Sequence, residues 1–193
     1  MMAREQSRSP QQPARYVALL RAVNLAGHNR VAMAALRDLC TGLGFLDSQT
    51  LLQSGNIVFR SHLRDSGELE RTLEAELARR LEVETEFMVR SGAEWRKIVS
   101  GNPFRAEAEG DPGHLLLMIL KQAVSAQAVK ELQAAISGRE VVRGAGREVY
   151  IVYPDGVGRS RLTISMIEKR LGTRATGRNW NTVLKLQALA EAM

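Results

Sequence analysis

The chain has one cysteine, few aromatic residues and no long apolar run, and each shortage excludes a class of protein. The single cysteine, Cys40, rules out an internal disulfide and a metal site built from several cysteines. Cys40 belongs to an apolar stripe at helical spacing, which favours a buried, inert thiol over a nucleophile. No hydrophobic segment approaches the roughly 20 residues of a membrane-spanning helix, so we expect no membrane partner.

Metal and secretion signals are also missing. His28, His62 and His114 lie far apart and form no ligand pair at metal spacing, so we expect no metal site. Residues 1–14 are polar and lack the hydrophobic stretch of a secretory signal, so we expect a disordered tail. With one cysteine and no such signal, the sequence favours a cytoplasmic protein.

What remains is the composition of an ordinary globular protein, with 45% hydrophobic and 25% charged residues. The net charge is +6, almost all of it from arginine, and the arginines are scattered along the chain. This charge permits contact with phosphates or nucleic acid without requiring it. Taken alone, it is a weak hint of an anionic partner.

The first half of the sequence has the element order of a ferredoxin-like fold. Continuous apolar runs and period-2 segments predict strands, and apolar residues at helical spacing predict helices. The expected strands are 15–23, 50–53, 56–61 and 85–90, and the expected helices are 33–43 and 69–81. Ser54-Gly55 is typical of a tight hairpin turn between the second and third strands. The resulting order, βαββαβ, is the ferredoxin-like pattern.

The second half repeats this order with a change at its end. A capping box at Ser91–Glu94 predicts a short helix, and an acidic, Gly/Pro-containing connection follows. The later elements are expected as strands at 114–120, 140–143 and 148–153 and helices at 129–136 and 162–171. The last strand is predicted to be missing or very short, with a polar turn and a C-terminal helix in its place.

The predicted fold class is therefore α+β, with two tandem ferredoxin-like (βαββαβ) lobes. The second lobe is modified, because its last strand is replaced by a polar turn and the C-terminal helix. The expected divisions are a tail (1–14), an N-terminal lobe (15–90), a connecting helix and linker (91–112), and a C-terminal lobe with its helix (113–193).

Four segments of the chain resemble a known family. They are RYVALLRAVNLAGHNRVAMAALRDL, LLQSGNIVF, GNPF and TGRNWNTVLKL. Together they are similar to an uncharacterised, mostly bacterial family catalogued as domain of unknown function 1697. One departure is Ala22-Val23, where family members commonly resemble Gly-Ile. The resemblance implies two ferredoxin-like lobes, the second modified, and no established activity, cofactor or catalytic residue.

Polar residues of these segments fall at strand ends, at turns and at the start of the C-terminal helix. The candidate ligand-binding residues are Arg21, Asn24, Gln53, Ser54, Asn56, Arg178, Asn179 and Asn181. Their amide and guanidinium groups suit anions or bases, but they make poor general bases and nucleophiles. The alternative is that each serves its own turn or helix cap. In particular, Asn179 or Thr176 can cap the last helix.

A second candidate is the segment 156–161, Gly-Val-Gly-Arg-Ser-Arg, which precedes a predicted helix. It resembles a phosphate-binding loop but lacks the lysine and the spacing of a P-loop. A glycine-rich turn in which Ser160 caps the helix is the simpler interpretation.

These features favour a binding module for an anionic, phosphate-containing ligand or for nucleic acid. Aromatic residues do not line the predicted strands, where only Tyr16 and Phe59 stand out, so base stacking on a sheet is disfavoured. The alternatives are an enzyme acting on a small phosphorylated or carboxylated substrate, or a structural or interaction protein. An enzyme would lack a visible general base, and the cofactor and oligomeric state stay open.

Overall fold

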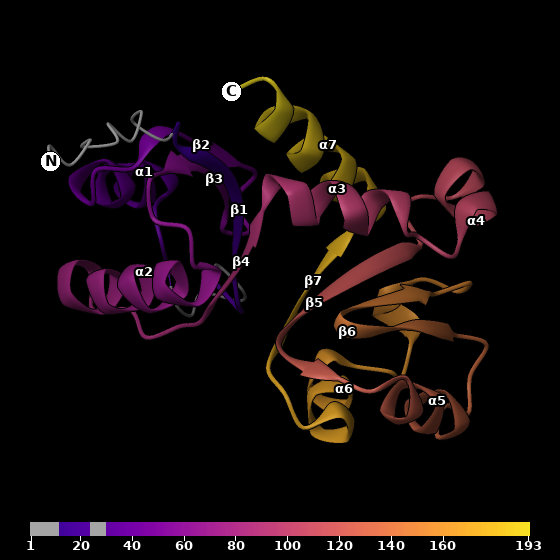
Figure 1. Ribbon diagram of the computed structural model, residues 1–193. Helices are drawn as coiled ribbons and strands as arrows, with labels where there is room; N and C mark the ends of the chain where they lie inside the picture. Colours follow the sequence, from indigo (N-terminus) through magenta and orange to yellow (C-terminus); the bar gives the residue numbers. More distant parts are fainter. Residues whose placement is uncertain (1–11, 24–29) are drawn as a thin grey trace, which may run out of the picture.

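A computed structural model describes residues 12–23 and 30–193 of the chain (Figure 1). Most of the expected tail and the candidate residue Asn24 lie outside these residues. Within the described ranges, seven strands form two antiparallel sheets, and seven α-helices pack against them. None of these helices is long and apolar enough to cross a membrane.

The first half contains the predicted elements in the predicted order. They are β1 (Ala14–Leu20), α1 (Met33–Gly42), β2 (Leu46–Leu51), β3 (Asn56–Ser61), α2 (Ser66–Leu81) and β4 (Phe87–Ser91). The strands form one sheet in the order β2-β3-β1-β4, and each neighbouring pair is antiparallel. Cys40 is buried in the core beneath this sheet, as expected from its apolar stripe.

The turn before β3 is longer than the sequence predicts. β2 ends at Leu51, so four residues rather than Ser54-Gly55 alone join the strands. The Asn56 side chain organises this turn, because its Nδ2 donates to the Leu51 carbonyl at 2.8 Å and to Ser54 Oγ at 2.9 Å. Gly55 has φ +71°, and a Cβ there would lie 2.7 Å from the Leu20 Cβ. The turn therefore packs closely onto the end of β1.

The second half begins with the predicted capping box, in which Ser91 and Glu94 exchange hydrogen bonds at the start of α3. Its elements are α3 (Gly92–Ser100), α4 (Arg105–Gly110), β5 (Leu115–Val124), α5 (Ala126–Ala134), β6 (Val141–Val152), α6 (Ile164–Leu171), β7 (Ala175–Asn179) and α7 (Trp180–Glu191). A single 3₁₀ turn, Val157–Arg159, lies between β6 and α6. The sheet order is β6-β5-β7, again antiparallel.

Two expectations for this half are wrong, and one element was not predicted. The last strand is present as β7. Its side chains are largely polar, so the sequence did not indicate a strand, and they are buried against the first half rather than against an apolar core. The two strands expected around 144–146 form one strand, β6, in which Gly144 and Gly146 adopt positive φ and the pairing with β5 shifts. The acidic connection contains a short helix, α4.

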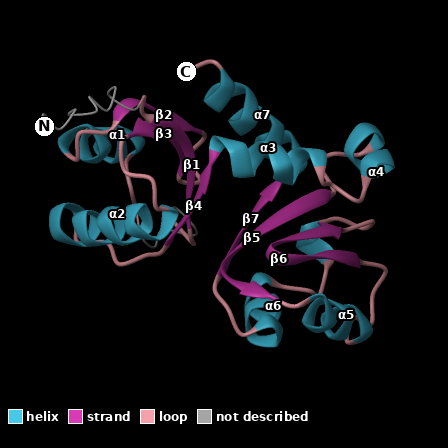
Figure 2. Ribbon diagram, in the orientation of Figure 1, coloured by secondary structure: helices cyan, strands magenta, loops and turns pink. Residues whose placement is uncertain are grey.

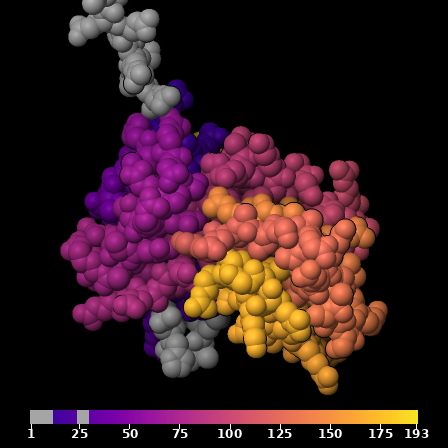
Figure 3. Space-filling model, turned by 60° about the horizontal axis from the view of Figure 1, so that its bottom comes forward, coloured from indigo at the N-terminus to yellow at the C-terminus, as the bar shows by residue number. Residues whose placement is uncertain are grey.

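Helices α3 and α7 lie between the two sheets, as Figure 2 shows. They share one core with the inner face of each sheet: Val17 and Val58 come from the first sheet, Leu117 from the second, and Trp95 and Trp180 from the helices. Helices α1 and α2 cover the outer face of the first sheet, and α5 and α6 cover that of the second. The halves thus form one packed body that meets along a seam (Figure 3).

Candidate functional site

Arg178, on β7, joins the two halves through its guanidinium group. This group has five N–H donors, and each has an acceptor. The acceptors are Asn56 Oδ1, Thr176 Oγ1 and the carbonyl oxygens of Gly177, Leu20 and Ser54. The four bonds to Thr176 and to the carbonyls measure 2.8–3.0 Å. Arg178 therefore ties β7 to the end of β1 and to the turn before β3.

The arrangement follows from local structure on both sides. Asn56 is fully buried, and its amide nitrogen is used within the turn, which leaves Oδ1 directed at Arg178. On β7, Thr176 and Arg178 point to the same face because side chains alternate along a strand. The Thr176 hydroxyl also donates to the Leu20 carbonyl, at 3.1 Å. Gly177 faces the other way, where its missing side chain leaves room for Met118 and Leu116.

The charge of Arg178 is buried without a counter-ion. The residue is 8% exposed, and all five of its acceptors are neutral; no carboxylate of the described chain pairs with it. Removal from water lowers the pKa of Arg178 to about 10. A buried cation that is hydrogen-bonded but not neutralised is unusual, because burying charge is costly unless an opposite charge is near.

Arg21, at the end of β1, also crosses between the halves. Its Nε and Nη2 donate to the two carboxylate oxygens of Glu168 on α6, at 2.6 and 2.8 Å. Burial by itself raises the pKa of Glu168, but hydrogen bonds from Arg21 and the Ala175 N–H, with the charges of Arg21 and Arg174, hold it below its ordinary value. Arg21 is thus a neutralised cation, and Glu168 is a weak base.

A cavity of about 320 Å³ lies along the seam between these two arginines. It is lined by Leu20, Arg21, Ala22, Val23, Ser54, Ile164, Ser165, Glu168, Ala175, Thr176, Gly177 and Arg178. Ile164 and Ser165 form the first turn of α6, where free backbone N–H groups and the helix dipole favour negative charge. A second hollow, of about 430 Å³, shares Ser165 and Glu168 with it and is also lined by Lys121, Lys169 and Arg174.

The predicted site residues therefore divide into two groups. Arg178, Asn56 and Ser54 are in contact, and Arg21 lines the same cavity as Arg178 and Ser54. The others do not line it: Asn179 caps α7 by accepting from the Thr182 N–H at 3.0 Å, Asn181 is exposed on the first turn of α7, and Gln53 is exposed in the turn before β3. The position of Asn24 lies outside the described residues.

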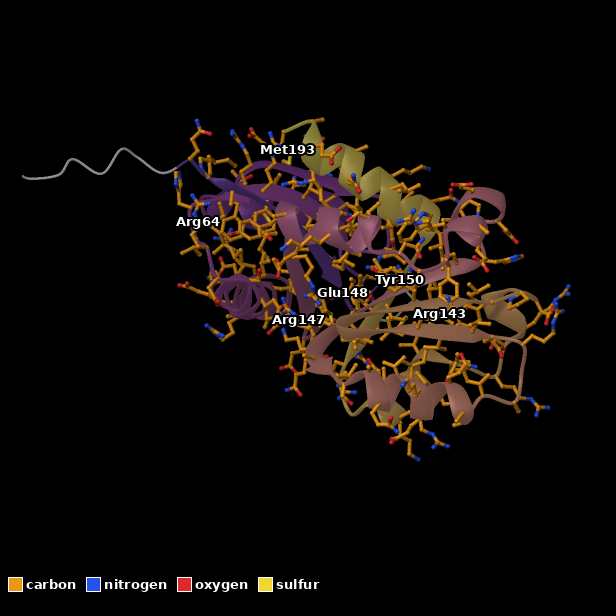
Figure 4. All side chains as sticks on the ribbon, turned by 45° about the vertical axis from the view of Figure 1, so that its right-hand side comes forward. Arg64, Arg143, Arg147, Glu148, Tyr150 and Met193 are labelled. Atoms are coloured by element: carbon orange, nitrogen blue, oxygen red, sulfur yellow. The ribbon has the colours of Figure 1, made fainter. Side chains whose placement is uncertain are left out.

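Two residues at the junction were not predicted. One is Glu168, the partner of Arg21. The other is Arg90 on β4, which is 1% exposed and donates to Glu148 Oε1 at 2.9 Å and to the carbonyls of Leu120 and Arg147. Figure 4 labels Glu148 and Arg147 on β6, where this strand faces the first half. A charged residue in an otherwise apolar strand was the only sequence signal for Arg90.

The residues around the cavity suit binding better than acid–base catalysis. A general base works best when its pKa lies near the working pH, whereas that of Glu168 is lowered. The other titratable groups of the cavity are the two arginines, which stay protonated. Nowhere in the described chain do three or more His, Cys, Asp or Glu residues gather to hold a metal ion.

Comparison with known proteins gives a family and a fold. A solved structure, the conserved bacterial protein SP0830 from Streptococcus pneumoniae, superposes with a TM-score of 0.72 at 21% identity, covering 92% of this chain and 98% of that chain. No curated protein matches. The model of the family "Protein of unknown function (DUF1697)" matches residues 14–150, which is most of the chain and ends before β7. On this match, the protein belongs to the DUF1697 family.

Proposed function

We propose that the protein is a binding module for a small anionic ligand, carrying a phosphate or a carboxylate group, in the cavity between the two halves. The observation that carries the proposal is the buried charge of Arg178, which no carboxylate among residues 12–23 and 30–193 neutralises. Because its N–H groups already have acceptors, Arg178 attracts the anion through its charge. The anion accepts hydrogen bonds from the first turn of α6, including Ser165. It also accepts from the Arg21 N–H groups that do not bond to Glu168.

The distribution of charge supports an anionic ligand. Residues 113–193 contain 12 Lys and Arg against 6 Asp and Glu, whereas residues 15–112 contain 13 against 14. The excess positive charge of the protein therefore belongs to the second half. A potential of this kind raises the local concentration of anions and speeds their association.

A small ligand fits better than a nucleic acid held on a sheet. Both faces of both sheets are covered by helices, so no strand surface is open for stacked bases. Nucleic acid would have to bind helices and loops. As part of the same proposal, we regard both halves as ferredoxin-like, the second with three strands. A cytoplasmic location remains an expectation from the sequence.

The direct test places a negative charge in the cavity without removing Arg178. Ser165 is exposed at the start of α6, where a glutamate favours the helix. Ser165→Glu should abolish binding of the anion, whereas Ser165→Gln, with the same shape and no charge, should keep it. Calorimetric titration with inorganic phosphate, glucose 6-phosphate, phosphoenolpyruvate, citrate and short single-stranded RNA and DNA supplies the measurement.

A second pair of variants distinguishes the effect of the Arg178 charge on binding from the effect of weakening the junction between the halves. Arg178→Met should weaken binding at least about tenfold, because removing a unit charge close to a partly buried anion costs on the order of 1 kcal/mol or more. Arg90→Met removes another buried arginine that also joins the halves but does not line the cavity, and this variant should bind the anion as wild type does. Equal binding by the glutamate and glutamine variants, or equal losses for the two arginine variants, would show that the cavity is not the site. Binding of RNA or DNA alone would favour the nucleic-acid alternative.

A further inference from the structure

A different cavity, of about 290 Å³, opens on the outer side of the second half. It lies between the end of α5 and the loop that leads from β6 to α6, on the side of the second sheet away from α3 and α7 (Figure 1). It shares no residue with the seam cavity, so it is independent of the function proposed above.

The floor of this cavity is apolar and belongs to the core. Leu162 and Tyr153 are buried, and Ile136 and Met166 pack against the same cluster. The Tyr153 hydroxyl donates to the Leu162 carbonyl at 3.1 Å, so it is used within the protein. Because Leu162 and Tyr153 are almost fully covered, the apolar surface that a ring can contact comes mainly from the half-buried Ile136 and Met166.

The rim, in contrast, is rich in arginine. Arg139, Arg159 and Arg161 line the cavity together with two carboxylates, Asp155 and Glu140. Both carboxylates have partners: Asp155 pairs with Arg139 at 2.9 Å, and Glu140 accepts from the Ser160 hydroxyl. The guanidinium groups of Arg159 and Arg161 are exposed, and within residues 12–23 and 30–193 they have neither a hydrogen bond nor an ion pair.

The loop fixes the backbone that carries these two arginines. Gly156 adopts φ +84° and starts a 3₁₀ turn that ends at Arg159. Ser160, between the arginines, is anchored because its hydroxyl bonds Glu140 and accepts from the Leu162 N–H at 2.9 Å. The backbone N–H groups of Gly156, Arg159 and Ser160 donate to carbonyls of the same loop. These three N–H groups are therefore not free to bind an anion, which leaves the guanidinium groups as its main donors.

We propose that this cavity binds a nucleoside monophosphate or a similar aromatic phosphate monoester. The ring lies on the apolar floor, and the phosphate lies between Arg159 and Arg161, whose planar guanidinium groups match phosphate oxygens in pairs. The volume is near the lower end of the roughly 300–1,000 Å³ usual for small-molecule sites, which suits one nucleotide and not a dinucleotide. Inorganic phosphate has no ring to contact the floor. A nucleoside has no phosphate to pair with Arg159 and Arg161.

Calorimetric titration of the full chain with AMP, adenosine and inorganic phosphate tests this proposal. AMP should bind wild type at least about tenfold more tightly than either fragment, because only AMP uses both the floor and the rim. The double variant Arg159→Ala/Arg161→Ala should lose at least about tenfold in AMP affinity. The matched control Arg170→Ala/Lys185→Ala removes the same charge from exposed helix positions of the same half, away from the cavity, and should change the affinity less than about twofold.

The proposal would be overturned by any of three results with the titrations and double variants above. They are an absence of saturable AMP binding, AMP binding no tighter than inorganic phosphate, and equal losses in the two double variants, which would indicate attraction by net charge alone. Ser165→Glu tells the two cavities apart. If that change removes AMP binding while Arg159→Ala/Arg161→Ala does not, AMP occupies the seam cavity, and this inference fails while the proposed function stands.

Discussion

Replacing Arg178 tests how a buried charge is balanced at the junction of the halves. Arg178→Met keeps much of the side-chain length and removes both the charge and the five donors. All five acceptors then lose the arginine. The Leu20 carbonyl and the Thr176 hydroxyl keep the bond between them, and Gly177 stays in the β5–β7 ladder, so the loss falls mainly on Asn56 Oδ1 and the Ser54 carbonyl. Arg178→Lys keeps the charge but offers at most three donors.

The expected magnitudes differ for the two variants. Two orphaned acceptors cost about 2–6 kcal/mol together. The lowering of the pKa of Arg178 to about 10 corresponds to roughly 3 kcal/mol against the charged side chain, and the methionine variant recovers that amount. We therefore expect Arg178→Met to lose only about 1 kcal/mol of unfolding free energy. Arg178→Lys retains the buried charge, and its three donors leave at least two of the five acceptors unserved, so it should lose about 4 kcal/mol.

Urea unfolding followed by circular dichroism measures both losses, and thermal unfolding gives a second estimate. For a chain of this size each kcal/mol shifts Tm by about 2–4 °C, so the lysine variant should melt about 6–12 °C below the methionine variant. The order of stability is the critical result: wild type, then methionine, then lysine. A lysine variant more stable than the methionine variant would refute the reasoning, because it would mean that the retained charge stabilises the junction.

Two further changes test neighbouring features. Gly55→Ala should lower the unfolding free energy, measured with urea, by about 2–3 kcal/mol, because φ is +71° and the new Cβ would lie 2.7 Å from Leu20 Cβ. Gly44→Ala, at φ +76° with open space around it, should lower it by only about 1–2 kcal/mol. Glu168→Gln should destabilise the protein at neutral pH and progressively less in acid. The folded-state pKa of Glu168 is lowered, so the stability that its charge contributes is complete above its unfolded value of about 4.5 and is lost as the pH falls through the folded value. A difference from wild type that does not change between pH 7 and pH 3 would contradict this account.

Periodicity and local signals were enough to predict most of the elements. The continuous run over 15–23, the leucine stripe before Leu81 and the capping box at Ser91 each depend on residues within a few positions of one another, and each is confirmed. Asn179 as the cap of α7 is of the same kind, although Thr176 was an equal alternative. Predictions failed where the environment of a residue comes from far along the chain.

β7 is the clearest failure. Thr176 and Arg178 are polar, so the segment did not resemble a strand, yet both are buried. Their partners, Leu20 and Asn56, lie more than 100 residues away in the sequence. Nothing local indicates such a partner, and the same holds for Arg21 and Glu168, which are 147 positions apart. The residue types of the site were therefore predictable, but their pairing was not.

The two buried arginines of the junction show why Arg178 merits attention as a ligand site. Arg90 is a cation buried between the same two halves, and the protein supplies Glu148 to neutralise it. Arg178 receives only neutral acceptors and lies beside a cavity. If Arg178 only joined the halves, a carboxylate partner such as the one Glu148 gives Arg90 would lower the free-energy cost of burying its charge. An apolar residue in place of Arg178 would avoid that cost altogether. The missing negative charge is what a bound anion would supply, and ligand binding would then also stabilise the junction.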